Sequence, residues 1–221
     1  YLLFPRFNST CVLWYANTGK LKMIPIQYFA EPGRDSGLQI SRAIAYYNSK
    51  ITLNENSALI AIDEDLFKVT FSDVPAVKAF TWAYRIKGLC LYHEYILSGT
   101  DENLCFRDTS NYASKKEGAL NGCGEIRCIT TYHNIIYVGC NRGLFILNAE
   151  GKIISSFSKQ NGLPDDYIYA IEVDAKKNIW CTTNKGIIRI QPDGSILQLR
   201  KEDGLQENEF NTNVALKEEN G

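Results

Sequence analysis

Hydrophobic and polar residues alternate in short stretches along this 221-residue chain, and turn-forming residues separate the stretches. The alternation is clearest in the second half, where four successive stretches are predicted to be β-strands: Ile168–Val173, Ile179–Thr182, Ile187–Gln191 and Ile196–Leu199. No sustained 3.6-residue period of apolar residues accompanies them. The pattern therefore predicts an all-β fold built from antiparallel sheets of four consecutive strands.

This four-strand pattern occurs more than once. Tyr137 precedes Trp180 by the same distance along the chain as Gly143 precedes Gly186. The connecting segments follow nearly the same spacing, since NGLPDD begins at Asn161 and DGLQEN at Asp203. A repeat of about 40 residues that combines short strands with glycine turns is typical of a β-propeller blade. Because one blade cannot bury both of its faces alone, the repeat also predicts several blades packed side by side.

The repeat continues towards the N-terminus through Gly99, Ala61 and Ala16, again at a spacing of about 40 residues. We therefore predict a partial β-propeller of about five four-stranded blades and the start of another, as a single propeller segment over residues 1–221. The predicted blades are residues 1–40, 41–84, 85–123, 124–166 and 167–209, and residues 210–221 open a further blade. A closed ring of five blades is the alternative, because propellers of four to eight blades occur.

The propeller prediction makes two specific expectations, one for the conformation of a turn residue and one for which side chains are buried. The turn position of Gly186 is matched by Gly143, Asn103 and Asp65, which are the residue types that best tolerate a positive φ. The residues expected to be buried between neighbouring sheets are Trp180, Ile171, Leu144 and Ile129.

Composition and charge fit a globular module and exclude some functions. Hydrophobic residues make up 45% of the chain, charged residues 22%, and the net charge is −1. Without a dense basic segment, nucleic acid is not an expected partner. No apolar stretch approaches the roughly 20 residues that span a bilayer. The two histidines, His93 and His133, are one repeat length apart, so they are interpreted as equivalent turn residues and not as acid-base groups.

The seven cysteines show no metal-binding or redox motif, and their odd number cannot pair completely within the chain. Cys90, Cys128, Cys140 and Cys181 fall in predicted strands, where a free cysteine acts as a small apolar residue. A disulfide involving Cys123 and Cys128 is left open.

The segment NGLPDDYIYAIEVDAKKNIWCTTNKGIIRI resembles the two-component regulator propeller repeat. The resemblance is carried by Gly162, Leu163, Pro164, Asp174, Trp180, Thr182 and Gly186. The segment DGLQENEFNTNVA resembles the linker and inner strand of a late blade in the same family. The resemblance is specific over roughly residues 124–215, and only spacing and turn chemistry support it before Tyr84.

The resemblance implies the periplasmic sensor region of a hybrid two-component histidine kinase and response regulator in an inner membrane. Many such proteins respond to oligosaccharides and regulate glycan-utilisation genes. The implied partners are a further propeller, an immunoglobulin-like domain, a membrane helix and a kinase, with a homodimer in the full protein. No cofactor is implied, and this chain holds none of the kinase parts.

The ligand face of such a segment is predicted from propeller geometry. The loops that lead into the inner strands and the turns between second and third strands share one face. The candidate ligand-binding residues there are Arg142, Tyr167, Asn184 and Asp165, since aromatic rings stack on sugars and planar polar groups bind hydroxyls. No catalytic or metal-binding residue is predicted. A protein-interaction or structural propeller, or a fragment of a propeller lyase or glycosidase, is the alternative.

Overall fold

A computed structural model describes residues 2–6, 10–15, 20–30, 48–54, 57–62, 65–70, 76–81 and 86–210 of the chain. The chain divides into two compact units, Tyr1–Ile86 and Lys87–Gly221, which are described one at a time. The residues that carry the strongest sequence repeat and the candidate ligand site all lie in the second unit.

The first unit contains one sheet of seven strands in the order β1-β2-β3-β7-β6-β5-β4. These strands are β1 (Leu2–Arg6), β2 (Thr10–Tyr15), β3 (Lys20–Ala30), β4 (Asn48–Asn54), β5 (Ser57–Ile62), β6 (Asp65–Thr70) and β7 (Ala76–Thr81). Strands β4 to β7 form an antiparallel meander within the predicted second blade. Strand β3 pairs with β7 in parallel, which joins strands of the first two predicted blades into one sheet, and the repeat does not predict this pairing.

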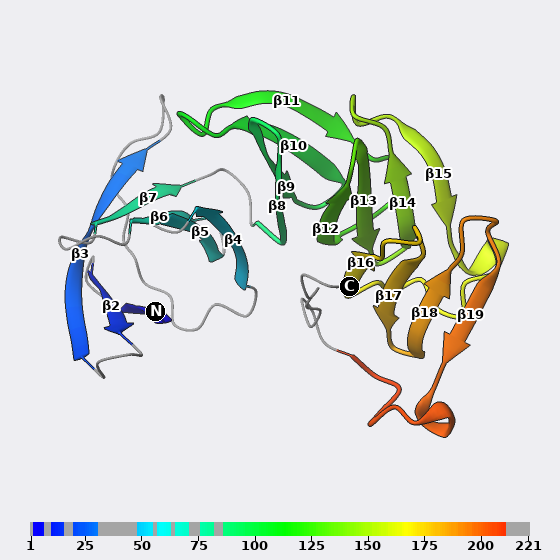
Figure 1. The fold of residues 1–221 in the computed structure, drawn as a ribbon. Helices are drawn as coiled ribbons and strands as arrows, with labels where there is room; N and C mark the ends of the chain where they lie inside the picture. The colour runs from blue at the N-terminus through cyan, green and yellow to red at the C-terminus, as the bar shows by residue number, and fades with distance from the viewer. Residues whose placement is uncertain are drawn as a thin grey trace. The chain divides into compact units, whose positions relative to one another are not determined.

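The second unit contains three separate four-stranded antiparallel sheets, each made of consecutive strands (Figure 1). The first holds β8 (Gly88–Tyr92), β9 (Tyr95–Gly99), β10 (Asn103–Asp108) and β11 (Ser114–Ala119). The second holds β12 (Ile126–Tyr132), β13 (Ile135–Cys140), β14 (Gly143–Leu147) and β15 (Ile153–Phe157). The third holds β16 (Ala170–Val173), β17 (Ile179–Thr183), β18 (Gly186–Ile190) and β19 (Ile196–Leu199). The predicted all-β class and the four-stranded sheets are therefore confirmed in this unit.

The three sheets stand side by side with their first strands adjacent. Strand β12 packs against β8 on one side and β16 on the other, while β11, β15 and β19 lie at the periphery (Figure 1). This is the arrangement of propeller blades. The sheets lie inside the predicted ranges 85–123, 124–166 and 167–209. Blade boundaries, the total number of blades and closure of the ring stay predictions, and residues 211–221 lie outside the described part.

One backbone hydrogen bond repeats at every junction between these sheets. The Ile126 amide donates to the Thr100 carbonyl (3.1 Å), and the Ile168 amide donates to the Cys140 carbonyl (3.0 Å). One blade later, the Phe210 amide donates to the Thr183 carbonyl (3.3 Å). The end of each second strand thus holds the start of the next inner strand, so both features lie on one face, as the sequence predicts.

The two linkers that follow β15 and β19 also repeat in atomic detail. Each contains a short 3₁₀ turn, η1 (Lys159–Asn161) and η2 (Lys201–Asp203). The Lys159 amide donates to Oδ1 of Asp166 (2.6 Å), and the Lys201 amide donates to Oδ1 of Asn208 (2.7 Å). A carboxylate and an amide oxygen serve this purpose equally well, because the linker needs only a side-chain acceptor for the free amide at the start of the turn.

The turn glycines are required by both conformation and space. Gly143 has φ 123° and Gly186 has φ 99°. A Cβ atom on Gly143 would lie 2.2 Å from the Phe157 carbonyl oxygen, and one on Gly186 would lie 2.0 Å from that of Leu199. The predicted positive φ at Asn103 is wrong. Asn103 begins β10, as Gly143 begins β14, but the positive φ of that turn (64°) belongs to the preceding residue, Glu102. Sequence spacing aligns the start of the third strand correctly but does not locate the strained residue.

The sheets pack through small residues on each second strand. A Cβ atom on Gly99 would lie 2.3 Å from Ile126, and one on Gly139 would lie 2.6 Å from Ile168, so each isoleucine of an inner-strand start occupies the space beside a glycine. As predicted, Ile129, Leu144 and Ile171 are buried. The hydrophobic core therefore runs between the sheets and not within any one of them.

The predicted burial of Trp180 is wrong, because its side chain is only half-buried. Strand β17 alternates, and its buried face carries Ile179, Cys181 and Thr183. Trp180 lies on the opposite face, where the Arg189 guanidinium is 5.6 Å from its ring. Alternation alone does not reveal which face of a sheet is packed, so the large aromatic side chain was placed on the wrong one.

The Trp180 ring instead anchors the turn between β16 and β17. Its Nε1–H donates to Oδ2 of Asp174 (3.0 Å), which also accepts from the Asn178 side chain (2.7 Å). The backbone amides of Lys176 and Asn178 donate to Oδ1 of Asp174 (2.9 and 2.8 Å). Partial burial alone would raise the pKa of this carboxyl, but the hydrogen bonds from Trp180, Asn178 and Lys176 together lower it to about 2.

Because the folded protein binds this proton less readily than the unfolded chain, Asp174 contributes stability above the ordinary carboxyl pKa of 3.8. That contribution is lost as the pH falls from about 4 to about 2. We expect Asp174→Asn to lower the melting temperature by a constant amount above pH 5 and to approach the wild type near pH 2.5. Thermal melts of both proteins across this range test it, and a difference that persists undiminished at pH 2.5 would contradict the assignment.

Candidate ligand-binding site

Three inner strands bring equivalent positions together at the face where the junction bonds lie. Lys87, Arg127 and Tyr169 occupy this position in successive blades, each one repeat length from the next, directly before or at the start of β8, β12 and β16. The turns between second and third strands supply Asp101, Asn141 and Asn184. Since both sets belong to the same end of their sheets, their side chains form one polar and aromatic cluster.

The charged part of this cluster is a chain of ion pairs. Nζ of Lys87 lies 3.1 Å from Asp101 and 2.8 Å from Glu125, and the Arg127 guanidinium lies 3.3 Å from the same Glu125 oxygen. Burial alone would lower the pKa of Lys87, but its hydrogen bonds to Glu125 and Asp101 raise it, so the ammonium stays charged. Arg127 is only 7% exposed, and a buried guanidinium is tolerated only where it is paired.

The aromatic part of the cluster covers Arg127. Its guanidinium lies 4.2 Å from the centre of the Tyr167 ring and 5.6 Å from that of Tyr169, and its Nη2 donates to the Tyr167 hydroxyl. The Tyr169 hydroxyl donates to Oδ1 of Asn184 (2.8 Å). Burial raises the pKa of Tyr169, which keeps this hydroxyl protonated as the donor. Tyr169 therefore links Tyr167 to Asn184, because its ring contacts the Tyr167 ring (centroids 5.1 Å apart) and its hydroxyl is hydrogen-bonded to Asn184.

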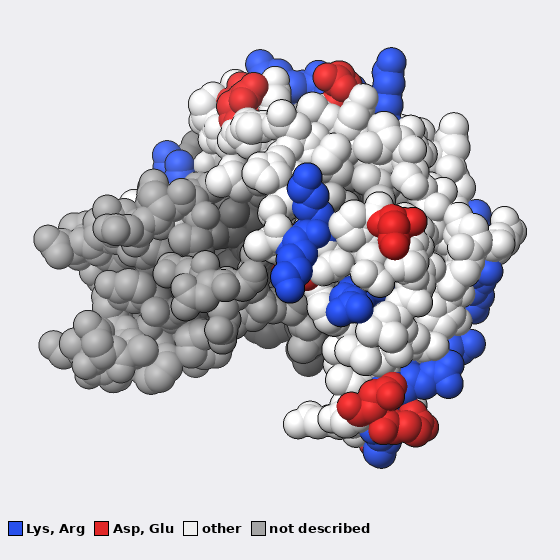
Figure 2. All heavy atoms as spheres, turned by 45° about the vertical axis from the view of Figure 1, so that its right-hand side comes forward, with Lys and Arg blue, Asp and Glu red and all other residues white. Residues whose placement is uncertain are grey.

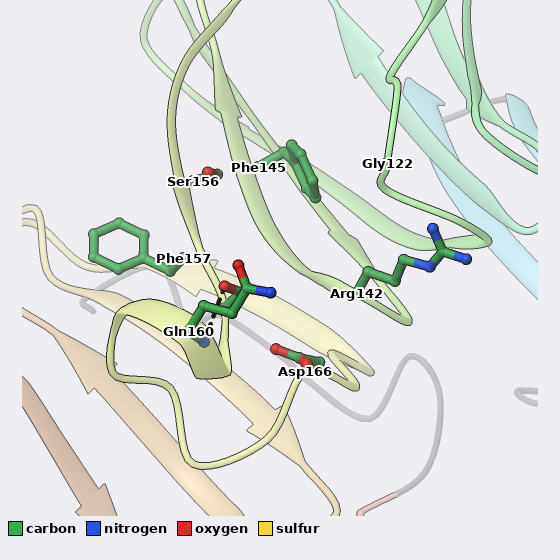
Figure 3. A pocket seen from close by; sticks show the side chains of 8 residues that line it. Gly122, Arg142, Phe145, Ser156, Phe157, Gln160 and Asp166 are labelled. Carbon is green, nitrogen blue, oxygen red and sulfur yellow. Dashed lines mark hydrogen bonds between the residues drawn. The ribbon is translucent and has the colours of Figure 1, made fainter.

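A hollow of about 370 Å³ lies between the β13–β14 turn and the linker after β15 (Figure 3). Its residues Arg142 and Asp166 are chain neighbours of Asn141 and Tyr167. Arg142 projects from the turn, while Gln160 and Asp166 lie close together on the linker side. The hollow is completed by Gly122, Phe145, Ser156, Phe157 and Ser158. Its lining thus combines a cation, a carboxylate, an amide and two aromatic rings, which is a set that can bind hydroxyl-rich or anionic groups.

The predicted ligand residues occupy three different surroundings. Arg142 lines the hollow, and Tyr167 and Asn184 belong to the Arg127 cluster. Asp165 is only 8% exposed, and its Oδ1 accepts from the Tyr167 amide (3.0 Å), with Nζ of Lys159 3.9 Å away. Its neighbour Asp166, and not Asp165, reaches the hollow. The assignment of all four residues to ligand binding stays a prediction.

Sequence reasoning missed the residues at the centre of this cluster. Arg127, Glu125, Lys87 and Tyr169 lie at or just before the first strands, and none of them is among the candidates drawn from sequence. The spacing of one repeat between Lys87 and Arg127 would have shown them as neighbours on adjacent blades, because equivalent positions of a propeller line the same surface.

The described surface carries no large patch of one charge in the view of Figure 2, where basic and acidic side chains are interspersed. Among the described residues no group of three or more histidine, cysteine, aspartate or glutamate side chains is placed to hold a metal ion.

His93 and His133 lie in the equivalent β8–β9 and β12–β13 turns, each with φ 52° and each edge-on to the preceding tyrosine. Their interpretation as turn residues is confirmed.

No helix in the described part of the chain is long and apolar enough to span a membrane.

No family model and no curated protein matches the sequence. Similarity is found among solved structures. The extracellular domain of a hybrid two-component system of B. thetaiotaomicron, BT3049, matches 97% of this chain with a TM-score of 0.65 and 16% identity. That of a second system of the same organism, BT4673, matches 71% with a TM-score of 0.59 and 21% identity.

This chain spans 32% and 22% of those two sensor domains, so it corresponds to a limited part of each. A computationally designed protein, Ika8, is similar at the same level, with a TM-score of 0.62 and 15% identity over 95% of this chain and 60% of its own. At such identities the similarity shows the fold alone. The fold is nevertheless the one expected from the resemblance to the two-component regulator propeller repeat.

Proposed function

We propose that this chain is a ligand-sensing propeller segment from the periplasmic region of a hybrid two-component sensor kinase. The sequence resemblance over residues 124–215 and the similarity in fold to two extracellular domains of such systems support this assignment. The full protein would be anchored in the inner membrane and would carry a further propeller, an immunoglobulin-like domain and a kinase, as a homodimer.

The proposed ligand is an oligosaccharide whose detection regulates glycan-utilisation genes through the rest of the protein. The observation that carries this proposal is the hollow lined by Arg142, Gln160 and Asp166. Asp166 directly precedes Tyr167 of the Arg127 cluster in the chain. Planar side chains bind pairs of sugar hydroxyls, and exposed ring faces stack on the apolar faces of sugars. No residue set in this cluster pairs a nucleophile with a base, so we assign it binding and no catalysis.

A sensor must bind its ligand more tightly in one arrangement than in another, because equal affinity for both shifts no equilibrium. The turns of the ligand face lie on loops outside the packed sheets, where side chains can change partners without disturbing the core. The proposed signal is therefore a change in how this face contacts neighbouring parts of the full protein.

Arg142→Ala is the cleanest test of the site, because this side chain is exposed and makes no ion pair within the described structure. We expect oligosaccharide affinity to fall at least about tenfold, which corresponds to the loss of one charge-assisted hydrogen bond. The melting temperature should stay within about 1 °C of the wild type. Isothermal titration with a panel of neutral and uronic-acid-containing oligosaccharides measures the affinity.

Lys176→Ala provides the matched control, since Lys176 is equally exposed in the turn between β16 and β17, at the other end of the sheet. It should bind as the wild type does. Tyr167→Ala is a less clean variant because it also uncovers Arg127, so some loss of stability is expected with it. If Arg142→Ala binds every oligosaccharide with the affinity of the wild type, the hollow is not part of the ligand site.

A further inference from the structure

Two cysteines meet at the junction between the first and second sheets of the second unit. Cys123 lies in the linker before β12, and Cys140 is the last residue of β13. Both side chains are completely buried in the same core cluster, and each thiol shifts the pKa of the other. Ile126, three residues after Cys123, pairs with Cys140 across β12 and β13, and the Asn141 amide donates to the Glu125 carbonyl (3.1 Å), so the two backbone segments that carry the cysteines lie side by side. Cys128 belongs to the other core cluster, next to Ile168 and Cys181, so the pair left open from sequence, Cys123 with Cys128, is not the one that the fold brings together.

The equivalent positions in the neighbouring blades are occupied by residues other than cysteine. Cys140 corresponds to Thr183, whose hydroxyl donates to the Gly186 carbonyl (2.9 Å) and accepts from the Lys185 amide (3.0 Å). The Cys140 thiol makes the same two contacts, to the Gly143 carbonyl (3.1 Å) and from the Arg142 amide (3.4 Å). Thr100 occupies this position in the preceding blade and donates to the Asn103 carbonyl (3.4 Å).

Cys123 lies three residues before the junction donor Ile126, and Asp165 lies three residues before the equivalent donor Ile168. A thiol is a weaker hydrogen-bond donor than a hydroxyl and cannot replace a carboxylate. The turn chemistry that explains Thr183 and Asp165 therefore does not explain cysteine at both corresponding positions of a single junction. A bond between the two cysteines explains both replacements at once.

We propose that Cys123 and Cys140 form a disulfide bond when the protein is in an oxidising compartment. The oxidant is a protein or small-molecule disulfide. The Cys123 thiolate attacks one of its sulfur atoms and releases the first oxidant thiolate. Cys140 then attacks the Cys123 sulfur, releases the second thiolate and closes the bond. The oxidant gains two electrons as its disulfide is reduced, and the two protons from the cysteines pass to its two thiolates.

The surroundings of the pair favour this order of attack. The interaction between the two thiols lowers the pKa of Cys123, whereas the same interaction, together with burial, raises the pKa of Cys140. Cys123 follows the exposed residues Asn121 and Gly122, so a local opening of this linker gives the oxidant access to it first. The Gly124 carbonyl, which accepts from the Cys123 thiol, also accepts from the Glu102 amide (2.9 Å) and keeps a partner after oxidation.

The bond is tested by peptide mapping of the protein exported to a bacterial periplasm, purified without reductant and alkylated in denaturant. Trypsin leaves Cys123 in residues 117–127 but both Cys128 and Cys140 in residues 128–142. Chymotryptic cleavage after Tyr132 or Tyr137 separates the latter two. We expect a cross-link between the Cys123 and Cys140 peptides that disappears on reduction, with Cys128 alkylated.

Cys128→Ala is the matched control and should keep the cross-link, while Cys140→Ala should abolish it. Reduction should lower the melting temperature of the wild type by about 5–10 °C and leave that of Cys123→Ala/Cys140→Ala unchanged, because the bond closes a short loop of the unfolded chain. Alkylation of both Cys123 and Cys140 in the exported protein, or a bond to Cys128, overturns the inference. The periplasm of the expression host supplies the oxidant, so the test does not depend on where the natural protein resides. Absence of the disulfide would therefore leave the proposed sensor function unaffected.

Discussion

Ile168→Ala is expected to destabilise the second unit by about 2–5 kcal/mol, which is the cost of a cavity left by a fully buried isoleucine. Ile168 is 0% exposed, and it fills the space beside Gly139 on the neighbouring sheet. Its amide also makes the junction bond to Cys140, which the substitution leaves in place. Chemical denaturation followed by tryptophan fluorescence measures the loss.

Ile187→Ala is the matched control, because Ile187 lies in β18 of the same sheet, on the half-buried face opposite to the one that carries Ile188 and Ile190. It should cost less than about half as much, in proportion to the smaller apolar area removed from contact. Equal losses for the two variants would show that the interface between these sheets is not the main core.

Gly186→Ala is expected to cost more than Gly194→Ala by at least about 1–2 kcal/mol. Both glycines have positive φ, 99° and 85°, so both alanines have the same backbone strain. Only at Gly186 does a Cβ atom meet the Leu199 carbonyl at 2.0 Å, whereas nothing lies within 4 Å of one at Gly194. The fourth strand must then move away from the third, which weakens the sheet edge.

Denaturant midpoints of the two variants measured side by side isolate the steric part, since the conformational part cancels. Gly143→Ala, in the preceding blade, should resemble Gly186→Ala because its Cβ atom would meet the Phe157 carbonyl in the same way. Identical midpoints for Gly186→Ala and Gly194→Ala would mean that the close approach of the outer strand is not a constraint on the turn.

The strands of the second unit could be predicted from sequence because each is bounded by turn residues at repeated spacings. Ile179–Thr182 and Ile196–Leu199 were located to within one residue for this reason. The inner strand was placed two residues early, since Ile168 alternates like a strand but is held by the junction bond before β16 begins. In the first unit the parallel pairing of β3 with β7 has no local signal, because pairing between distant strands depends on tertiary contacts.

The position of the candidate face could be predicted from sequence, but its side-chain contacts could be predicted only in part. Propeller topology predicts that Arg142, Tyr167 and Asn184 lie at one end of the sheets, and the structure has them there. It could not show that Tyr167 covers a buried Arg127 or that Asp165 is held within its own loop, because both depend on side-chain direction. The Cys123–Cys140 contact was equally invisible, since spacing alone does not show which thiols face each other.

Hydrogen exchange with and without a saturating oligosaccharide tests the central claim most directly. If this face binds the ligand, amide protection should increase in the β13–β14 and β17–β18 turns and in residues 165–169. The turns at the opposite end, around His93, His133 and Lys176, should be unchanged. Protection confined to that opposite end, or no change anywhere in residues 86–210 with an oligosaccharide that the full protein detects, would contradict the proposed ligand-sensing role of this segment.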